Sequence, residues 1–160
     1  MAAFSSGCDG LMNDQYAAMR EQWMVDTPPS GATPISEIKS GRSEGELETG
    51  SNIVIRARID AGDMSPWTQD QAAFIVTDAS GHDGDSNHNP HECPFCRRDI
   101  RDHIALVQFT AEDGRVVPVD ARQLLGVAEN ELLVVQGTIT EADGDDLVID
   151  AQKLHRIPRN

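Results

Sequence analysis

The stretch that decides the fold runs Leu133-Val134-Val135-Gln136-Gly137-Thr138-Ile139 and then, after a polar turn, Leu147-Val148-Ile149-Asp150-Ala151-Gln152-Lys153-Leu154. Both runs are rich in β-branched and aliphatic residues, which favour strands. The residues between them include Asp143-Gly144-Asp145-Asp146, which has the turn chemistry of a β-hairpin. Gly137 inside the first run indicates a sharp bend in that strand. We therefore predict two antiparallel strands, at residues 132–140 and 147–151.

Three more strands are predicted upstream of this hairpin. Residues 53–60 alternate, with Ile53, Ile55, Ala57 and Ile59 on one face and Arg56, Arg58 and Asp60 on the other. Residues 72–78 and 104–110 form two further apolar runs, and the second turns at residues 112–114 into residues 115–119. Residues 120–130 suit a short helix, because Asp120 can cap its start. Residues 51–160 are therefore predicted to form one mainly β domain.

Five strands with one helix between the third and the fourth resemble an OB-fold, a five-stranded Greek-key barrel. The hairpin at residues 133–154 is similar to the closing hairpin of nucleic-acid-binding OB domains of the anticodon-binding type. The resemblance covers residues 51–157 and implies a non-enzymatic binding domain. The chain departs from this pattern in a polar insert at residues 79–102. With this insert, the chain resembles small predicted bacterial lipoproteins that carry one.

Cysteine and histidine residues gather in this insert. Two thiolates separated by two residues, Cys93 and Cys96, can grip one tetrahedral ion, and Pro94 stiffens the turn between them. Two more donors are needed, and His88 and His91 lie just upstream, with His82 and His103 in reserve. This donor set favours zinc, with copper as a weaker fit. An ion would also order a Gly-, Asp- and Asn-rich loop that has no core of its own. The alternative is a local disulfide or idle thiols in a polar loop.

The same cysteine pair also resembles the active-site dithiol of glutaredoxin-like proteins, and Val117-Pro118-Val119 faintly resembles their substrate-side proline. In those proteins the dithiol directly follows a buried strand, whereas a polar loop precedes Cys93 here. Arg97 excludes covalent haem attachment, which needs histidine at that position. A dithiol redox function stays open as an alternative to zinc.

The part of the chain before the barrel divides into three segments. Residues 4–9 contain small residues followed by Gly7-Cys8 and resemble the lipobox of bacterial lipoproteins, so Cys8 in segment 1–10 is a candidate lipidation site. Residues 1–4 lack the basic start and apolar region of a secretory signal. Residues 11–26 are predicted to be a helix, because Met12, Tyr16, Met19 and Trp23 share one face. Residues 27–50 are rich in Pro, Gly, Ser and Glu, which predicts a flexible linker.

Charge argues against nucleic acid as the partner. The chain has 27 acidic residues against 13 Lys and Arg, a formal net charge of -14, and nucleic-acid affinity depends largely on neutralising phosphates. The candidate ligand surface is small and consists of Arg56, Arg58, Trp67 and Phe95. Two arginines are weak against this repulsion. Single-stranded nucleic acid is therefore kept only as the last alternative.

No motif of a known enzyme class is present. Asp78, Asp83 and Asp85 are interpreted as loop solubilisers, because the bidentate Glu of a calcium loop is missing. The sequence therefore predicts a non-enzymatic OB-type binding module with a zinc knuckle, whose partner is an unidentified protein or small ligand. The predicted location is exported, periplasmic or membrane-anchored, with a cytoplasmic location as the alternative. The runner-up function is a periplasmic protein that handles zinc or copper, or a dithiol redox protein.

Overall fold

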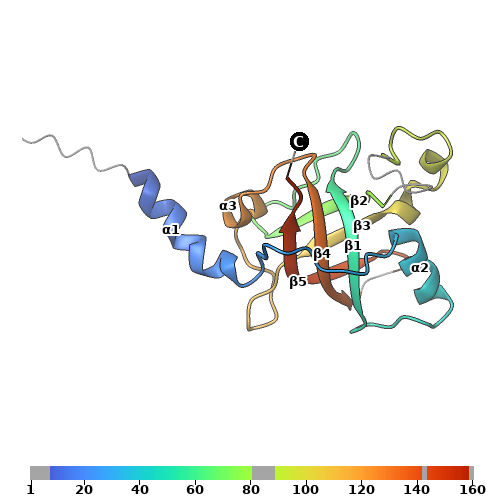
Figure 1. The fold of residues 1–160 in the computed structure, drawn as a ribbon, viewed down its shortest axis with the longest axis horizontal. Coiled ribbons are helices and arrows are strands. Elements are labelled where there is room, and N and C mark those ends of the chain that lie inside the picture. Colours follow the sequence, from blue (N-terminus) through green and yellow to red (C-terminus); the bar gives the residue numbers. More distant parts are fainter. Residues whose placement is uncertain (1–7, 81–88, 142–143, 159–160) are drawn as a thin grey trace, which may run out of the picture.

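Five strands close into a barrel, as the alternating apolar pattern predicts (Figure 1). The computed structural model describes residues 8–80, 89–141 and 144–158. The strands are β1 (Asn52–Ile59), β2 (Ala73–Asp78), β3 (Ile104–Gln108), β4 (Leu132–Thr140) and β5 (Val148–Arg156), and the helices are α1 (Cys8–Glu21), α2 (Ile35–Ser43), α3 (Ala121–Leu125) and the 3-10 helix η1 (Cys96–His103). Around the barrel the strand order is β1-β2-β3-β5-β4. The mainly β, five-stranded barrel is confirmed, and its order is that of an OB-like fold.

Strand pairing sets the topology. The pairs β1–β2, β2–β3, β4–β5 and β1–β4 are antiparallel, and β3 pairs with β5 in parallel. The helix α3 lies between β3 and β4 in the chain, where the sequence predicts it. Its cap is the predicted one, because the Asp120 carboxylate accepts a hydrogen bond from the backbone N–H of Arg122 at 2.8 Å. Residues 115–119 are not a strand, and only an isolated bridge between Thr110 and Val116 replaces the predicted extension.

The barrel closes tightly at Gly137. The register of β4 against β5 shifts between Gln136 and Gly137. A Cβ atom added at Gly137 would lie 2.3 Å from the backbone oxygen of Asp150. Glycine is therefore required here by the close approach of β5, as its position inside an apolar strand indicates.

The predicted flexible linker at residues 27–50 is wrong. This segment contains α2, whose Ile35 and Ile38 are buried and belong to the core of the barrel. The chain before α2 runs across the barrel over β5, β4 and β1 (Figure 1). The backbone N–H of Val25 donates to Leu154 of β5 at 3.0 Å, and the N–H of Thr33 donates to Val54 of β1 at 2.8 Å. Although this segment is rich in Pro and Ser, two buried apolar side chains and these backbone hydrogen bonds attach it to the domain.

The amino-terminal helix is shifted from its prediction and is partly anchored. The predicted helix covers residues 11–26, whereas α1 spans Cys8–Glu21 and extends away from the barrel (Figure 1). Trp23 follows the helix and is buried, with its ring edge-on to Phe109 at a centroid distance of 5.4 Å. The Nε of Arg20 also donates to the backbone oxygen of Leu124 in α3 at 2.6 Å. The last turn of α1 is thus held on the barrel.

Candidate metal and thiol site

The insert between β2 and β3 has almost no apolar core of its own. Among its described residues, 79–80 and 89–103, only Ala79, Pro90 and Cys96 are buried. Its exposed side chains include Phe95, which is 84% exposed. Few buried apolar groups offset the entropy of ordering these residues. The insert therefore depends on polar contacts, or on a bound group, for its order.

Cys93 and Cys96 meet at the start of η1. Both are thiols, and a hydrogen bond joins their side chains. The backbone N–H groups of Cys96 and Phe95 also donate to the sulfur of Cys93, and the N–H of Arg97 donates to the backbone oxygen of Cys93 at 3.0 Å. The turn thus aims both sulfur atoms at one point, as the two-residue spacing predicts.

The two thiols differ in environment. The backbone N–H of Cys96 is the main cause that lowers the pKa of Cys93, which lies at the surface. Burial raises the pKa of Cys96 to about 11, and the neighbouring Cys93 and Asp78 add to this shift. In the metal-free chain Cys93 is therefore the more readily ionised of the two thiols.

His91 is held by the barrel and does not join the thiols. Its Nε2 lies 2.8 Å from the hydroxyl of Thr77, and this hydroxyl donates to the backbone oxygen of Asp60 at 2.7 Å. Because the hydroxyl proton is used on Asp60, Nε2 of His91 is the donor in the other bond. A Cβ atom at Gly62 would lie 2.9 Å from Nδ1 of His91. His91 thus connects the insert to the first turn after β1, and Nδ1 is the nitrogen left for a ligand.

Two buried carboxylates lie beneath the insert, and the positions predicted for them from the sequence are wrong. Asp60 is expected on the outer face and Asp78 as a loop solubiliser, but their exposed fractions are 8% and 7%. Asp60 accepts the N–H of Gly62 at 2.8 Å, and Asp78 accepts the hydroxyl of Ser80 at 2.8 Å. Asp60 directly follows β1 and Asp78 is the last residue of β2, and this position at the end of an apolar strand is the signal that identifies them. Their charge makes this end of the barrel favourable for a cation.

The predicted ligand set is only partly brought together. Cys93 and Cys96 meet, His91 faces Thr77, and His103 ends η1. His82 and His88 lie outside the described residues, as do Asp83 and Asp85. Within the described part of the chain, no three His, Cys, Asp or Glu side chains are grouped so that they could hold an ion. The predicted four-ligand site therefore stays a prediction that depends on His88.

The candidate ligand surface of Arg56, Arg58, Trp67 and Phe95 is not one cluster of contacts in the described residues. Arg56 and Arg58 project from the same face of β1. Arg58 donates to the backbone oxygen of Asn130 at 3.4 Å, and the Nε of Arg56 is buried with no hydrogen-bond partner among the residues described. Phe95 lies apart from them on the insert. These residues do not form the continuous basic and aromatic groove of a single-strand binder.

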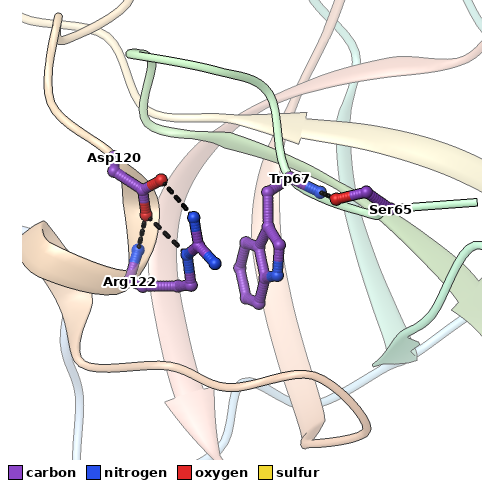
Figure 2. Close-up of polar contacts among 4 residues, drawn as sticks. All are labelled: Ser65, Trp67, Asp120 and Arg122. Atoms are coloured by element: carbon purple, nitrogen blue, oxygen red, sulfur yellow. Dashed lines mark hydrogen bonds and ion pairs between the residues drawn. The ribbon is translucent and has the colours of Figure 1, made fainter.

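Trp67 instead contacts the helix α3, as Figure 2 shows. The guanidinium carbon of Arg122 lies 5.0 Å from the centre of a Trp67 ring, and Asp120 holds that guanidinium through an ion pair of 2.7 Å. The other ring neighbour is Phe74, edge-on at 5.9 Å. A cation–π contact at an exposed site is worth about 0.5–1 kcal/mol. The Trp67 side chain therefore connects the β1–β2 loop to α3, and part of its ring surface is already used.

A polar hollow of about 480 Å³ lies where α2 meets the end of η1 and the β4–β5 turn. Its walls include Lys39 and Arg42 of α2, with Asp102 and Asp145 opposite. The Lys39 ammonium donates to the backbone oxygen of Arg101, and burial lowers its pKa. Arg42 donates to the backbone oxygen of Asp146 at 2.9 Å. Both cations are bound to backbone carbonyl oxygens, so they fasten α2 to the insert and the hairpin.

The comparisons with known proteins do not identify a role for these residues. No family model matches the chain, and no curated protein matches it. One similar solved structure is a putative aspartyl-tRNA synthetase from Leishmania major Friedlin, with a TM-score of 0.47 and 12% identity. The match covers 95% of this chain and 26% of that protein, so the chain spans about a quarter of its length. In the described part of the chain, no helix is long and apolar enough to cross a membrane.

Proposed function

We propose that this protein is a non-enzymatic binding module in which Cys93 and Cys96 bind one zinc ion that orders the insert. The observation that carries the proposal is that these two thiols meet in a segment whose described residues 89–103 bury only Pro90 and Cys96. A segment without a core gains order when an ion cross-links it, because the binding free energy then offsets the ordering entropy.

The electrostatics of the site support a cation. Burial, then the neighbouring Cys93 and then Asp78 raise the pKa of Cys96, so a bound cation would offset both the burial and the repulsion from the carboxylate. Zinc accepts thiolate and imidazole ligands in a tetrahedral arrangement. The proposed ligands are Cys93, Cys96, His88 and Nδ1 of His91, with His103 as a replacement for His91. For His91 to take part, ordering of the insert has to bring its Nδ1 to the thiols, because in the described residues His91 is held at Thr77 and does not group with them.

Cobalt substitution tests this ligand set. Cobalt in a tetrahedral thiolate site gives intense visible and thiolate-to-metal absorption, so the spectrum reports both sulfur ligation and geometry. We expect these bands in the full-length protein and in Cys8→Ser, a cysteine control outside the insert. We expect them to be lost in Cys93→Ser and weakened in His88→Ala and His91→Ala. A spectrum without sulfur bands, or one unchanged in Cys93→Ser, would contradict the proposal.

The proposal includes export and a lipid at Cys8. It is supported by the resemblance of residues 4–9 to a lipobox and by the direction of α1, which extends away from the barrel (Figure 1). A lipid at the far end of α1 leaves the barrel accessible to its partner. Mass spectrometry of the protein from its native cells checks this directly. An unmodified Cys8 in a cytoplasmic fraction would exclude the anchor and leave the zinc proposal unaffected.

A further inference from the structure

We propose that the polar hollow between α2, the end of η1 and the β4–β5 turn binds a small zwitterionic ligand, either an α-amino acid or a short peptide with free ends. Its volume of about 480 Å³ lies within the range of ligand sites, roughly 300–1,000 Å³. The inference names a ligand for the proposed binding module. It does not depend on zinc, because the hollow lies at the opposite end of η1 from Cys96.

One wall of the hollow is a polar face of α2. Lys39 and Ser40 follow Ser36 by three and four residues, a spacing that places side chains on the same side of a helix. Ile35 and Ile38 are buried in the core on another side of α2. The hydroxyls of Ser36 and Ser40 make no hydrogen bond within the part of the chain that the structure describes. The helix is therefore held on the barrel by its apolar side, while hydroxyl groups and a cation line the hollow.

Charges of both signs line the hollow without pairing across it. Lys39 and Arg42 lie on α2, with Asp102 and Asp145 opposite. Burial lowers the pKa of Lys39, and the charges of Asp102 and Asp145 are among those that act in the opposite direction, so these carboxylates are near it. However, no ion pair joins Lys39 or Arg42 to a carboxylate among the described residues. Opposite charges are thus held near each other with space between them.

Both cations keep donors for a ligand. The Lys39 ammonium donates to the backbone oxygen of Arg101, and one terminal nitrogen of Arg42 donates to that of Asp146. An ammonium and a guanidinium each carry further N–H groups. A carboxylate between them would accept charge-assisted hydrogen bonds, which are stronger than neutral ones. The two backbone contacts also fix the cations before a ligand arrives, which lowers the entropy cost of binding.

The balance of charges discriminates among small ligands. A free anion such as phosphate would be attracted by the two cations but repelled by Glu44, Asp102 and Asp145, which also line the hollow. A lone cation would be repelled by Lys39 and Arg42. A ligand with a carboxylate at one end and an ammonium group at the other is complementary to both sets. Its carboxylate therefore lies at the two cations, and its ammonium group lies at Asp102 and Asp145.

Nitrogen–proton correlation NMR of the full-length protein tests this proposal. The common α-amino acids and glycylglycine are titrated separately to millimolar concentrations, which distinguishes a free amino acid from a peptide. We expect at least one of them to shift the amide signals of Ser36, Ser40 and Asp102 to saturation. The N-acetyl form of that ligand lacks the ammonium group, and its amide form lacks the carboxylate. Each should bind at least about tenfold more weakly, because each loses one set of charge-assisted hydrogen bonds.

Three variants test the residues assigned. Lys39→Gln removes the positive charge and keeps an N–H group for the backbone oxygen of Arg101, and it should weaken binding about tenfold. Asp102→Asn should do the same from the other side, and its side chain is exposed, so the fold does not depend on it. Glu37→Gln removes an equal charge from the same helix outside the hollow and should leave the affinity unchanged. Circular dichroism checks that each variant keeps the barrel.

Four results would overturn the proposal: no saturable shift with any compound, shifts that spread outside the hollow, equal binding of either blocked form, or unchanged affinity in both Lys39→Gln and Asp102→Asn. The zinc site is tested by its cobalt spectrum, so failure of one proposal is distinguishable from failure of the other.

Discussion

Replacing Trp23 with alanine should strongly destabilise the barrel, although Trp23 precedes every strand in the sequence. Its side chain is 5% exposed, packs edge-on against Phe109 and belongs to the barrel core. The backbone around it is also fixed, because its carbonyl accepts the N–H of Leu154 at 2.7 Å. A buried Trp→Ala substitution costs about 3–5 kcal/mol. At about 2–4 °C per kcal/mol for a chain of this size, the melting temperature should fall by about 6–20 °C.

Trp67 provides a matched control, because it is the only other tryptophan in the chain. It is half-buried at the edge of the core, and its contacts include Arg122 and Phe74. We expect Trp67→Ala to cost below about 2 kcal/mol. Urea unfolding followed by circular dichroism measures both variants. Tryptophan emission adds a second readout, since the blue-shifted component should disappear only in Trp23→Ala. A Trp23→Ala variant no less stable than Trp67→Ala would refute the assignment of Trp23 to the core.

Three further outcomes follow from the described contacts. Gly137→Ala should cost about 1–3 kcal/mol or more in urea unfolding, because its Cβ would lie 2.3 Å from the Asp150 backbone oxygen; an unchanged midpoint would contradict the tight β4–β5 approach. Asp120→Ala should cost about 1 kcal/mol through the lost helix cap, and Asp120→Asn only a few tenths. Hydrogen bonding from Arg122 lowers the Asp120 pKa, so its contribution is present above the unfolded pKa and lost as pH falls through the lower folded value; Asp120→Asn should lack this acid-induced loss. Fluorescence anisotropy with mixed-sequence single-stranded DNA or RNA should show no binding at micromolar protein in near-physiological salt, and a saturable, salt-sensitive rise that disappears in the Arg56→Ala, Arg58→Ala variant would contradict this.

The strands of the barrel are predictable from sequence because each combines an apolar alternation with clear turn chemistry at its ends. The alternation in β1 places Ile53, Ile55, Ala57 and Ile59 inside, as expected. The cap at Asp120 and the bend at Gly137 are local signals, so they too are confirmed. Features that depend on residues close together in the sequence are therefore predicted correctly.

The predictions that differ from the structure concern contacts between segments that are distant in sequence. In residues 27–50 the high content of Pro, Gly, Ser and Glu outweighs Ile35 and Ile38 in a prediction from sequence, but the folded chain buries both side chains in the core. Trp23 fits the helical face predicted for residues 11–26, but the ring that it packs against, Phe109, lies far from it in the sequence. The burial of Asp60 likewise follows from the insert that covers it through Asn89, at 3.4 Å.

The candidate site is predicted in part for the same reason. The proximity of Cys93 and Cys96 is a local property of a two-residue spacing. The position of His91 is not local, because it follows from a hydrogen bond to Thr77 on β2. Spacing alone therefore places the two candidate sulfur donors together, and the whole ligand set of the proposed site stays a prediction.

The most direct test of the zinc proposal is the metal content of the full-length protein, purified without added metal and without a chelator. Elemental analysis should find one zinc ion per chain in the wild type and in the Cys8→Ser control. It should find close to none in the Cys93→Ser, Cys96→Ser double variant, whose barrel should remain folded by circular dichroism. Zinc at full stoichiometry in the double variant, or a wild-type chain that binds none even when zinc is supplied, would contradict the proposal.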